Sequence, residues 1–278
     1  MLSYRHSYHA GNFADVVKHS VLIEILKHLI KKEAGFDYID THAGAGLYDL
    51  ESEHAQKLQE HESGFTKIEP SRFPELDKYF DIVCDVNKSS SKKRYPGSPV
   101  IAMNFLRSQD RSWLFELHSS DFVLLKNNTL KNKRVRLSQS DGFKGALALL
   151  PPLSRRGLVL IDPSYEIKSD YQVAIEFLAS AYKKFSTGIY ALWYPVVDRK
   201  RIDSLERKIK SSGIKNIQRF ELGITEDRER GGMTAAGVIV INPPWTLMKT
   251  MQSILPKFAE DLGQEKTGYY KSDVLVGE

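Results

Sequence analysis

Short apolar runs recur along this chain, and stretches with an amphipathic helical pattern separate most of them. The apolar runs, each the length of a β-strand, cover Phe36–Asp40, Trp113–Leu117, Arg134–Ser140, Gly157–Ile161, Gly188–Tyr194, Ile217–Gly223 and Gly237–Ile241. The helical patterns cover about Ala14–Lys32, Pro99–Ser108, Ser120–Leu130, Asp170–Phe185 and Arg199–Ser211. Strands that alternate with helices predict an α/β fold with a doubly wound, seven-stranded, mostly parallel sheet. A loop rather than a helix joins the last two strands, so they can pair antiparallel at or near the sheet edge.

One connection is too long for a single helix. About seventy residues lie between Asp40 and Trp113, several times the dozen or so that a crossover requires. Residues 48–97 are rich in charge and are interrupted by prolines. We therefore expect a helical subdomain inserted at 48–97 into a main domain formed by residues 1–47 and 98–278. Ser98-Pro99 predicts an N-cap followed by proline at the first helical position, where the chain returns to the sheet.

Composition is that of an ordinary globular protein. Of the 278 residues, 41% are hydrophobic and 27% charged, and 40 basic against 35 acidic residues give a net charge of +5. This mild excess permits a polyanionic partner without requiring one. The single cysteine, Cys84, excludes an intrachain disulfide and a cysteine-clustered metal site. No apolar run approaches the ~18 residues of a membrane span, and the N-terminus lacks the apolar core of a signal peptide, so we expect a cytoplasmic protein.

A glycine-containing turn, DTHAGAG (40–46), follows the first predicted strand. Glycines there let the backbone approach a ligand at the carboxyl end of the sheet, where doubly wound folds bind nucleotides. Glu116 and Asp141 lie at the ends of the next two strands. Their acceptor-only carboxylates suit the ribose hydroxyls and the adenine amine of a bound nucleoside, although either acid could instead cap the following helix. The three strand ends together favour an adenosine-containing cofactor.

A second motif, Asp162-Pro163-Ser164-Tyr165, follows the apolar strand Gly157–Ile161. It resembles the (Asp/Asn/Ser)-Pro-Pro-(Tyr/Phe/Trp) motif of amino-methyltransferases that use S-adenosylmethionine. An exocyclic adenine amine is a poor nucleophile because its lone pair is delocalised into the ring. A carboxylate that accepts its N–H bonds makes the nitrogen more nucleophilic. The proline stiffens the turn, and the aromatic ring stacks on an extruded base.

A competing motif, Asn242-Pro243-Pro244-Trp245, matches the same pattern. Only 33 residues follow it, and they contain no further visible strand pattern. In the usual order of such folds the motif ends the fourth strand, and three more strands follow. Asp162 meets that requirement and Asn242 does not, so we interpret residues 242–245 as a structural turn off the last strand.

Several motifs, in order along nearly the whole chain, are similar to those of the RlmJ family. They are YRHSYHAGNFADVVKH (4–19), DTHAGAG (40–46), YPGSP (95–99), ELHSSD (116–121), SDGF (140–143), DPSYE (162–166), GGMTAAG (231–237) and INPPW (241–245). The resemblance implies a Rossmann-like methyltransferase fold with a helical insertion. It also implies transfer of a methyl group from S-adenosylmethionine to the N6 amine of an adenine in bacterial 23S ribosomal RNA.

The resemblance further implies which residues form the site. The residues that line the S-adenosylmethionine pocket are His19, His42, Ser98, Glu116, Asp141, Gly142 and Asp162. Those that face the RNA or the target base are Tyr4, His6, Lys18 and Tyr165. Asp162 is in addition the catalytic proton acceptor. The family usually has proline at the position of Ser164, a difference that concerns the geometry of the turn rather than the reaction.

The residues alone leave alternatives open. Lys18 and His19 open an amphipathic helix, whose polar side is ordinarily solvated. His6, His9 and His19 lie close together in the sequence, which suggests a metal site. No carboxylate pair at ligand spacing accompanies them, so we expect no metal there. The basic run at 126–136 fits a solvated helix end as well as it fits phosphate contacts.

Two other functions compete with RNA methylation. The Asp-Pro-x-Tyr motif fits transfer to an adenine in DNA equally well, and only the family resemblance favours RNA. A non-catalytic RNA-binding or assembly protein with a vestigial cofactor fold is the other, and the intact Asp162 and Tyr165 argue against it. We expect a monomer that acts on ribosomal RNA.

Overall fold

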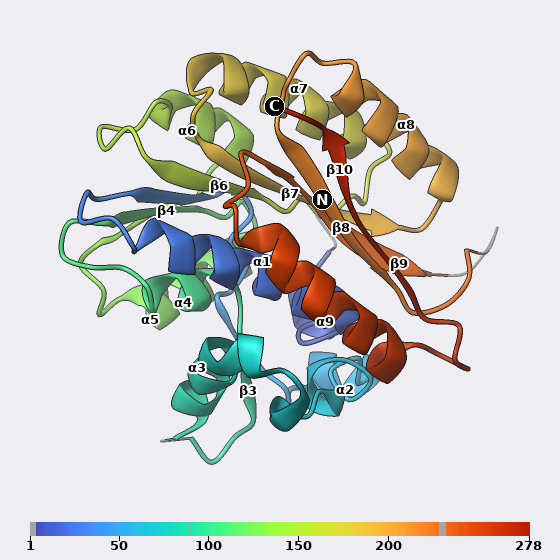
Figure 1. Ribbon diagram of the computed structural model, residues 1–278. Helices are drawn as coiled ribbons and strands as arrows, with labels where there is room; N and C mark the ends of the chain where they lie inside the picture. The colour runs from blue at the N-terminus through green and yellow to red at the C-terminus, as the bar shows by residue number, and fades with distance from the viewer. Residues whose placement is uncertain (1–3, 89, 228–231) are drawn as a thin grey trace.

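The computed structural model describes residues 4–88, 90–227 and 232–278. Within these ranges, an eight-stranded sheet with the order β10-β8-β9-β7-β6-β1-β4-β5 forms the centre of the molecule (Figure 1). Its strands are β1 (Asp37–Asp40), β4 (Arg111–Phe115), β5 (Val135–Ser138), β6 (Gly157–Ile161), β7 (Ile189–Val196), β8 (Ile217–Gly223), β9 (Ala235–Ile241) and β10 (Tyr269–Val276). A separate two-stranded sheet pairs β2 (Leu47–Asp49) with β3 (Arg94–Pro96).

The main sheet is mostly parallel, as the alternation of strands and helices predicts. Strands β5, β4, β1, β6 and β7 pair in parallel, whereas β9 pairs antiparallel with both β7 and β8. The prediction that the last two of the seven strands pair antiparallel is therefore confirmed. The expected number of seven strands is wrong, because β10 adds an eighth strand antiparallel to β8 at the sheet edge.

The eighth strand has a weak sequence signal for a physical reason. An edge strand is covered less than a central one, so it needs no continuous apolar run. Tyr269–Val276 reads YYKSDVLV, with three polar residues at its middle, and its residues are half-buried or exposed. Pairing with β8 rather than apolar patterning gives this segment its structure.

Helices cover both faces of the sheet, and β6 illustrates why. Its five residues are buried, with Leu158 and Leu160 in one apolar core and Val159 and Ile161 in the other. The first core packs against α1 (Phe13–Leu29), α4 (Ser98–Met103), α5 (Ser119–Thr129) and α9 (Leu247–Leu262). The second packs against α6 (Gly142–Leu149), α7 (Asp170–Lys184) and α8 (Arg199–Lys210). A strand buried on both faces needs apolar residues at every position, which is what GLVLI supplies.

The segment 48–97 leaves the sheet after β1 and lies below α1 and α9 in the view of Figure 1. The β2–β3 pair closes its base, and it contains α2 (Glu53–Leu58), α3 (Asp77–Asn87) and short 3₁₀ turns. Its apolar residues join the core of the main domain, where the ring of Phe73 stacks on that of Phe258 in α9 at 4.9 Å between centroids. The division into a main domain and an inserted helical subdomain therefore remains a prediction.

The predicted cap at Ser98 is wrong. Helix α4 begins at Ser98 itself, and the residue in the capping position is Gly97. The hydroxyl of Ser98 instead donates a 2.7 Å hydrogen bond to Oδ2 of Asp40. Because Asp40 is fully buried, its carboxylate requires such donors, and this requirement outweighs the capping preference of serine. None of the helices in the described ranges has the length and hydrophobicity required to cross a bilayer.

Candidate active site

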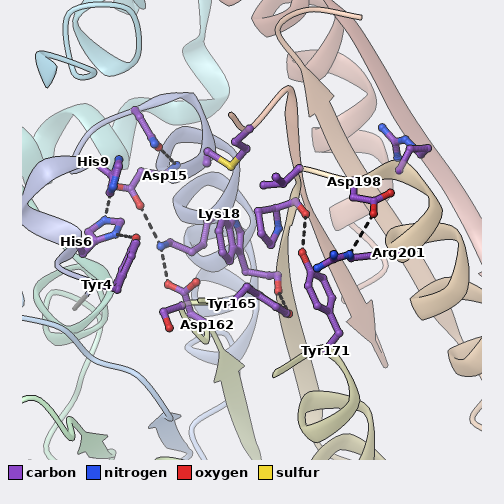
Figure 2. Close-up of a pocket in the computed structure, with 18 of the residues that line it drawn as sticks. Tyr4, His6, His9, Asp15, Lys18, Asp162, Tyr165, Tyr171, Asp198 and Arg201 are labelled. Carbon is purple, nitrogen blue, oxygen red and sulfur yellow. Dashed lines mark hydrogen bonds and ion pairs between the residues drawn. The ribbon is translucent and has the colours of Figure 1, made fainter. Parts of the chain in front are cut away.

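Two cavities lie at the carboxyl ends of the parallel strands, one at β1, β4 and β6 and the other at β6 and β7, and they meet after β6. The smaller has a volume of about 280 Å³ and the larger about 770 Å³. Five residues line both cavities and so form the wall between them: Tyr4, His6, Lys18, Asp162 and Ser164. Figure 2 shows the larger cavity, with Tyr4 and His6 on one side of Asp162 and Tyr171 and Arg201 on the other.

The structure brings all the predicted site residues to these two cavities. The smaller cavity is lined by each residue expected to hold the cofactor, namely His19, His42, Ser98, Glu116, Asp141, Gly142 and Asp162. The larger cavity is lined by each residue expected to face the substrate, namely Tyr4, His6, Lys18 and Tyr165. Their individual roles stay predictions, but their clustering is what such roles require.

Glu116 follows β4 and is fixed by backbone groups. Its Oε2 accepts a 2.8 Å hydrogen bond from the N–H of Gly44, and its Oε1 accepts a 2.6 Å bond from the N–H of His118. Burial raises the pKa of Glu116. Gly44 has φ +61°, and a Cβ there would lie 2.3 Å from the hydroxyl of Tyr48. Glycine is thus required for the turn to bring its N–H to Glu116.

Asp141 and Gly142 bring the start of α6 to the same cavity. Oδ1 of Asp141 accepts from the N–H groups of Phe143 and Lys144, so this carboxylate does cap the following helix, as the alternative interpretation has it. The capping uses one carboxylate oxygen, and the residue lines the cavity as well. A Cβ on Gly142 would lie 1.9 Å from the carbonyl oxygen of Thr41, so only glycine permits this close approach of α6 to the turn after β1.

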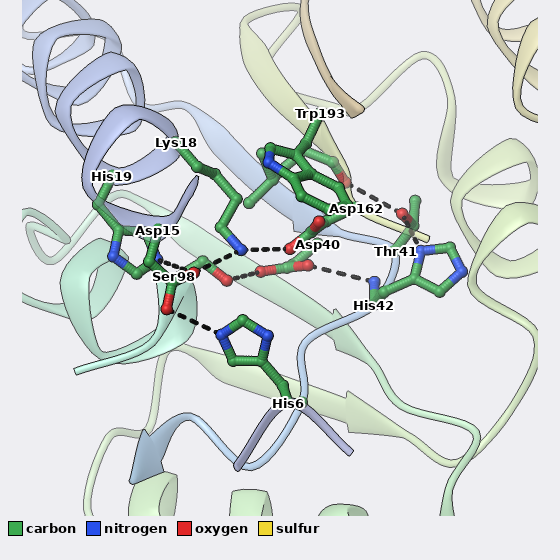
Figure 3. A network of polar contacts seen from close by, with 12 residues as sticks. His6, Asp15, Lys18, His19, Asp40, Thr41, His42, Ser98, Asp162 and Trp193 are labelled. Carbon is green, nitrogen blue, oxygen red and sulfur yellow. Dashed lines mark hydrogen bonds and ion pairs between the residues drawn. The ribbon is translucent and has the colours of Figure 1, made fainter. Parts of the chain in front are cut away.

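A buried network of charged groups lies at the wall between the cavities (Figure 3). The Nζ of Lys18 is 2.6 Å from Oδ2 of Asp162 and 3.0 Å from Oδ1 of Asp15, and the Lys18 side chain is only 5% exposed. Burial opposes the charge on Lys18, but the two carboxylates outweigh it and raise its pKa well above the usual value. Oδ2 of Asp15 contacts Nε2 of His6 at 2.9 Å. Burial likewise opposes the charge on Asp15, yet His6 and Lys18 hold its pKa well below the usual value.

Neutral polar groups surround this charged network. Nδ1 of His19 lies 2.9 Å from the hydroxyl of Tyr95 and 3.2 Å from that of Tyr79, both of which belong to the segment 48–97. Burial lowers the pKa of His19 to about 3 and that of His42 to about 4, so both rings are neutral near pH 7. Burial also favours the neutral form of Asp40, but for an acid this raises the pKa, here to about 6.

The motif Asp162-Pro163-Ser164-Tyr165 turns sharply away from β6. Tyr165 has φ +54°, in the left-handed region, and its hydroxyl donates a 2.7 Å hydrogen bond to the carbonyl oxygen of Trp193 in β7. This bond fixes the ring of Tyr165 within the larger cavity, next to Tyr171 at 4.4 Å between ring centroids. An aromatic surface therefore begins directly beside the carboxylate of Asp162.

Comparison with known proteins identifies the family. The family model described as ribosomal RNA large subunit methyltransferase D, RlmJ, matches residues 33–276. Proteins named ribosomal RNA large subunit methyltransferase J from Escherichia coli and Haemophilus influenzae are 48% and 44% identical to this chain over the full length of both sequences. The chain belongs to the RlmJ family. The crystal structure of a Legionella pneumophila protein is 36% identical, with a TM-score of 0.85 over 96% of this chain and 98% of that one.

Membership of the RlmJ family confirms the resemblance stated from the motifs. It also confirms the Rossmann-like methyltransferase fold, with the correction of eight strands. In this RlmJ-family chain, the competing motif lies away from both cavities. Asn242, with φ +52°, donates through Nδ2 to the carbonyl oxygens of Ser186 and Gly188, immediately before β7. These bonds fit the interpretation of residues 242–245 as a structural turn.

The sequence patterns did not predict two residues that line the site of this RlmJ-family protein. Asp15 precedes Lys18 by three positions in α1, and that helical spacing could have paired them. Trp193 lines the larger cavity from the middle of β7, and its ring centroid lies 5.6 Å from Nζ of Lys18. No local pattern marks it. Among the described residues, no group of three or more histidine, cysteine or acidic side chains could hold a metal ion.

Proposed function

We propose that this chain transfers a methyl group from S-adenosylmethionine to the N6 amine of one adenine in 23S ribosomal RNA. Membership of the RlmJ family supports the reaction class. The observation that carries the proposal is the position of Asp162 in the wall between the two cavities. The smaller cavity is lined by residues suited to bind the cofactor, and the larger one is lined by aromatic side chains.

The residues around the smaller cavity fit S-adenosylmethionine. Glu116 offers acceptor oxygens to the two ribose hydroxyls, and Asp141 offers one to an adenine amine. Gly44 and Gly142 let the segments that line this cavity pack closely, because a Cβ at either position would clash with Tyr48 or Thr41 respectively. The chemistry that the cofactor supplies when bound is an electrophilic methyl group on a sulfonium sulfur.

The chain's own groups prepare the amine. Asp162 shares Oδ2 with Lys18, which leaves Oδ1 as the acceptor for an N6–H bond of the target adenine. Burial opposes the charge on Lys18, but Asp15 and Asp162 outweigh it and raise its pKa well above the usual value, so Lys18 stays charged beside Asp162. As the new N–C bond forms, Asp162 accepts the proton that the amine releases. Tyr165, held by its bond to Trp193, stacks on the extruded base.

The same proposal covers the partner and the setting. The RNA offers one extruded adenine to the larger cavity, and the protein acts as a monomer in the cytoplasm. Tyr4 and His6 line both cavities, so they are suited to contact the adenine at the side where the two cavities meet.

The test is methyl transfer from labelled S-adenosylmethionine to 23S ribosomal RNA, followed by mass-spectrometric mapping of the modified nucleoside. We expect N6-methyladenosine at one position with the wild-type protein, and an initial rate of transfer lower by about 10²–10³ with folded Asp162→Ala. The variant Asn242→Ala is the matched control, because it alters the other proline motif and should retain transfer. A folded wild-type protein that modifies DNA but not ribosomal RNA, or that labels another base, would overturn the proposal.

A further inference from the structure

The larger cavity extends well past the residues assigned to the target base. Its volume of about 770 Å³ is in the range of sites for drug-sized ligands, whereas a single nucleobase is smaller. Beyond Tyr165, the cavity is lined by Tyr171, Val197, Asp198, Lys200 and Arg201. These five residues are here called the outer subsite. Figure 2 shows Tyr171 and Arg201 on the side of the cavity opposite Tyr4 and His6.

Aromatic rings lead from Asp162 into the outer subsite. The rings of Trp193 and Tyr165 are 5.9 Å apart between centroids, and those of Tyr165 and Tyr171 are 4.4 Å apart. Tyr171 is oriented by a 3.4 Å hydrogen bond from its hydroxyl to the carbonyl oxygen of Pro195. Stacking on an exposed ring suits any base, because every base has a π-face. A row of rings thus continues the surface on which the target adenine is proposed to stack.

Three basic side chains lie at the N-terminus of α8, next to the row of aromatic rings. Arg199, Lys200 and Arg201 form the first turn of α8, where the helix dipole disfavours positive charge. Arg199 is neutralised by the buried Glu221 and by Asp227, so it has a structural partner.

The other two cations are available to a ligand. Lys200 is exposed and has no carboxylate within 4.0 Å in the described ranges. Arg201 pairs with Asp198 at 3.1 Å, but both side chains are substantially exposed, and such a pair contributes little. Asp198 also accepts from the N–H of Lys200, so its charge is directed at its own helix.

We propose that the outer subsite binds the nucleotide adjacent to the target adenine in single-stranded RNA. The base of that nucleotide stacks on Tyr171, and its phosphate is bound by Lys200 and Arg201. This inference rests on the proposed function, because it takes RNA as the ligand of the larger cavity.

The first test removes the two cations and compares a matched control. The double variant Lys200→Gln/Arg201→Gln is set against Arg207→Gln/Lys210→Gln, which removes one arginine and one lysine from the exposed side of the same helix. In the first pair, we expect KM for 23S ribosomal RNA to rise at least about tenfold, because the loss of even one charge-assisted bond has an effect of that size, with the loss in KM rather than kcat. The salt dependence of KM should weaken by about one unit of slope per lost phosphate contact.

The control pair should change neither KM nor the salt dependence. An equal effect of both pairs would mean that the helix acts through distributed charge, and it would overturn the assignment of a subsite. An unchanged KM in Lys200→Gln/Arg201→Gln would overturn it as well. Calorimetry with S-adenosylmethionine should give unchanged affinity in every variant.

The second test concerns the stacking ring. Tyr171→Ala should weaken the binding of a labelled single-stranded RNA oligonucleotide about tenfold, and Tyr171→Phe should recover most of that loss because it keeps the ring. Binding that is unchanged in Tyr171→Ala, or that Tyr171→Phe fails to recover, would refute stacking on this ring. Binding is measured without turnover, so it separates the two proposals. A wild-type protein that binds this RNA through the outer subsite but transfers no methyl group would refute the proposed function alone.

Discussion

The substitution Asp162→Asn tests whether the buried Lys18 controls the carboxylate that we propose accepts the proton. Related amino-methyltransferases use asparagine at the corresponding motif position, so the motif alone predicts a mild loss. The structure predicts a severe one. Nζ of Lys18 lies 2.6 Å from Oδ2 of Asp162, and an ammonium group has donors only, so it must face an oxygen. The single amide oxygen of asparagine would be committed to Lys18, and its NH₂ group would face the adenine amine, donor against donor.

The expected magnitude follows from this geometry. Loss of one preorganised electrostatic partner costs about 10²–10³ in kcat, so Asp162→Asn should fall close to Asp162→Ala. Stability should suffer less. Lys18 keeps Asp15 at 3.0 Å, so the change should cost less than the roughly 3–5 kcal/mol of breaking a buried ion pair outright. The assay is single-turnover methyl transfer to 23S ribosomal RNA, with the free energy of unfolding measured in urea.

A double-mutant cycle isolates the cause. In Lys18→Met the ammonium is gone, so the amide oxygen of Asp162→Asn is free to accept from the adenine. The same substitution should therefore cost less rate in the Lys18→Met background than in the wild type. Rates are normalised to folded protein, because Asp15 is only 1% exposed and loses one of its partners in this background. Equal effects in the two backgrounds, or a nearly active Asp162→Asn, would refute this account of Lys18.

Four further outcomes are expected. Glu116→Ala should weaken cofactor binding at least about tenfold in calorimetry, because it removes both acceptor oxygens offered to the ribose. Glu60→Ala should raise KM for RNA without changing cofactor affinity, because Glu60 holds His9 at 3.0 Å and Asn12 at 2.9 Å and His9 stacks on Tyr4. Asp40 has its pKa raised from 3.8 to about 6, so the folded state loses about 3 kcal/mol as pH rises from near 4 through 6, and urea unfolding of Asp40→Asn should lack this decline. Asn242→Ala should lower the free energy of unfolding by about 1–2 kcal/mol, through two lost bonds to backbone carbonyls, and leave transfer per folded molecule unchanged.

The sheet was largely predictable because its central strands are buried on both faces. Gly157–Ile161 and Ile217–Gly223 are strands over the same residues that the apolar patterns indicate. Elements that depend on tertiary contacts were missed. Helix α6 contains two glycines and α9 contains Pro256, so both contradict local helix propensity. Three-residue strands such as β2 and β3 are too short for any alternating pattern to be visible.

The site was predictable where chemistry coincides with a strand end. Glu116 and Asp162 directly follow recognisable strands, and parallel strands bring their carboxyl ends to one edge of the sheet. The partners of these acids were not predictable in the same way. Lys18 and Asp162 are 144 positions apart, and their contact depends on how α1 lies across the sheet. The hydroxyls of Tyr79 and Tyr95 reach His19 only because the segment 48–97 folds back onto α1.

Helix α1 holds several polar residues in the interior of the protein. Sequence reasoning left open a solvated side for this helix, but nearly all its residues are buried, including Asp15, Lys18 and His19. A buried charge is expensive unless it is paired, and apolar side chains of similar size would serve folding at least as well. The pairing of Lys18 with two carboxylates therefore contributes little that the fold itself requires. In the proposed mechanism, what the pairing supplies is a charged group held against Asp162 in the wall between the two cavities.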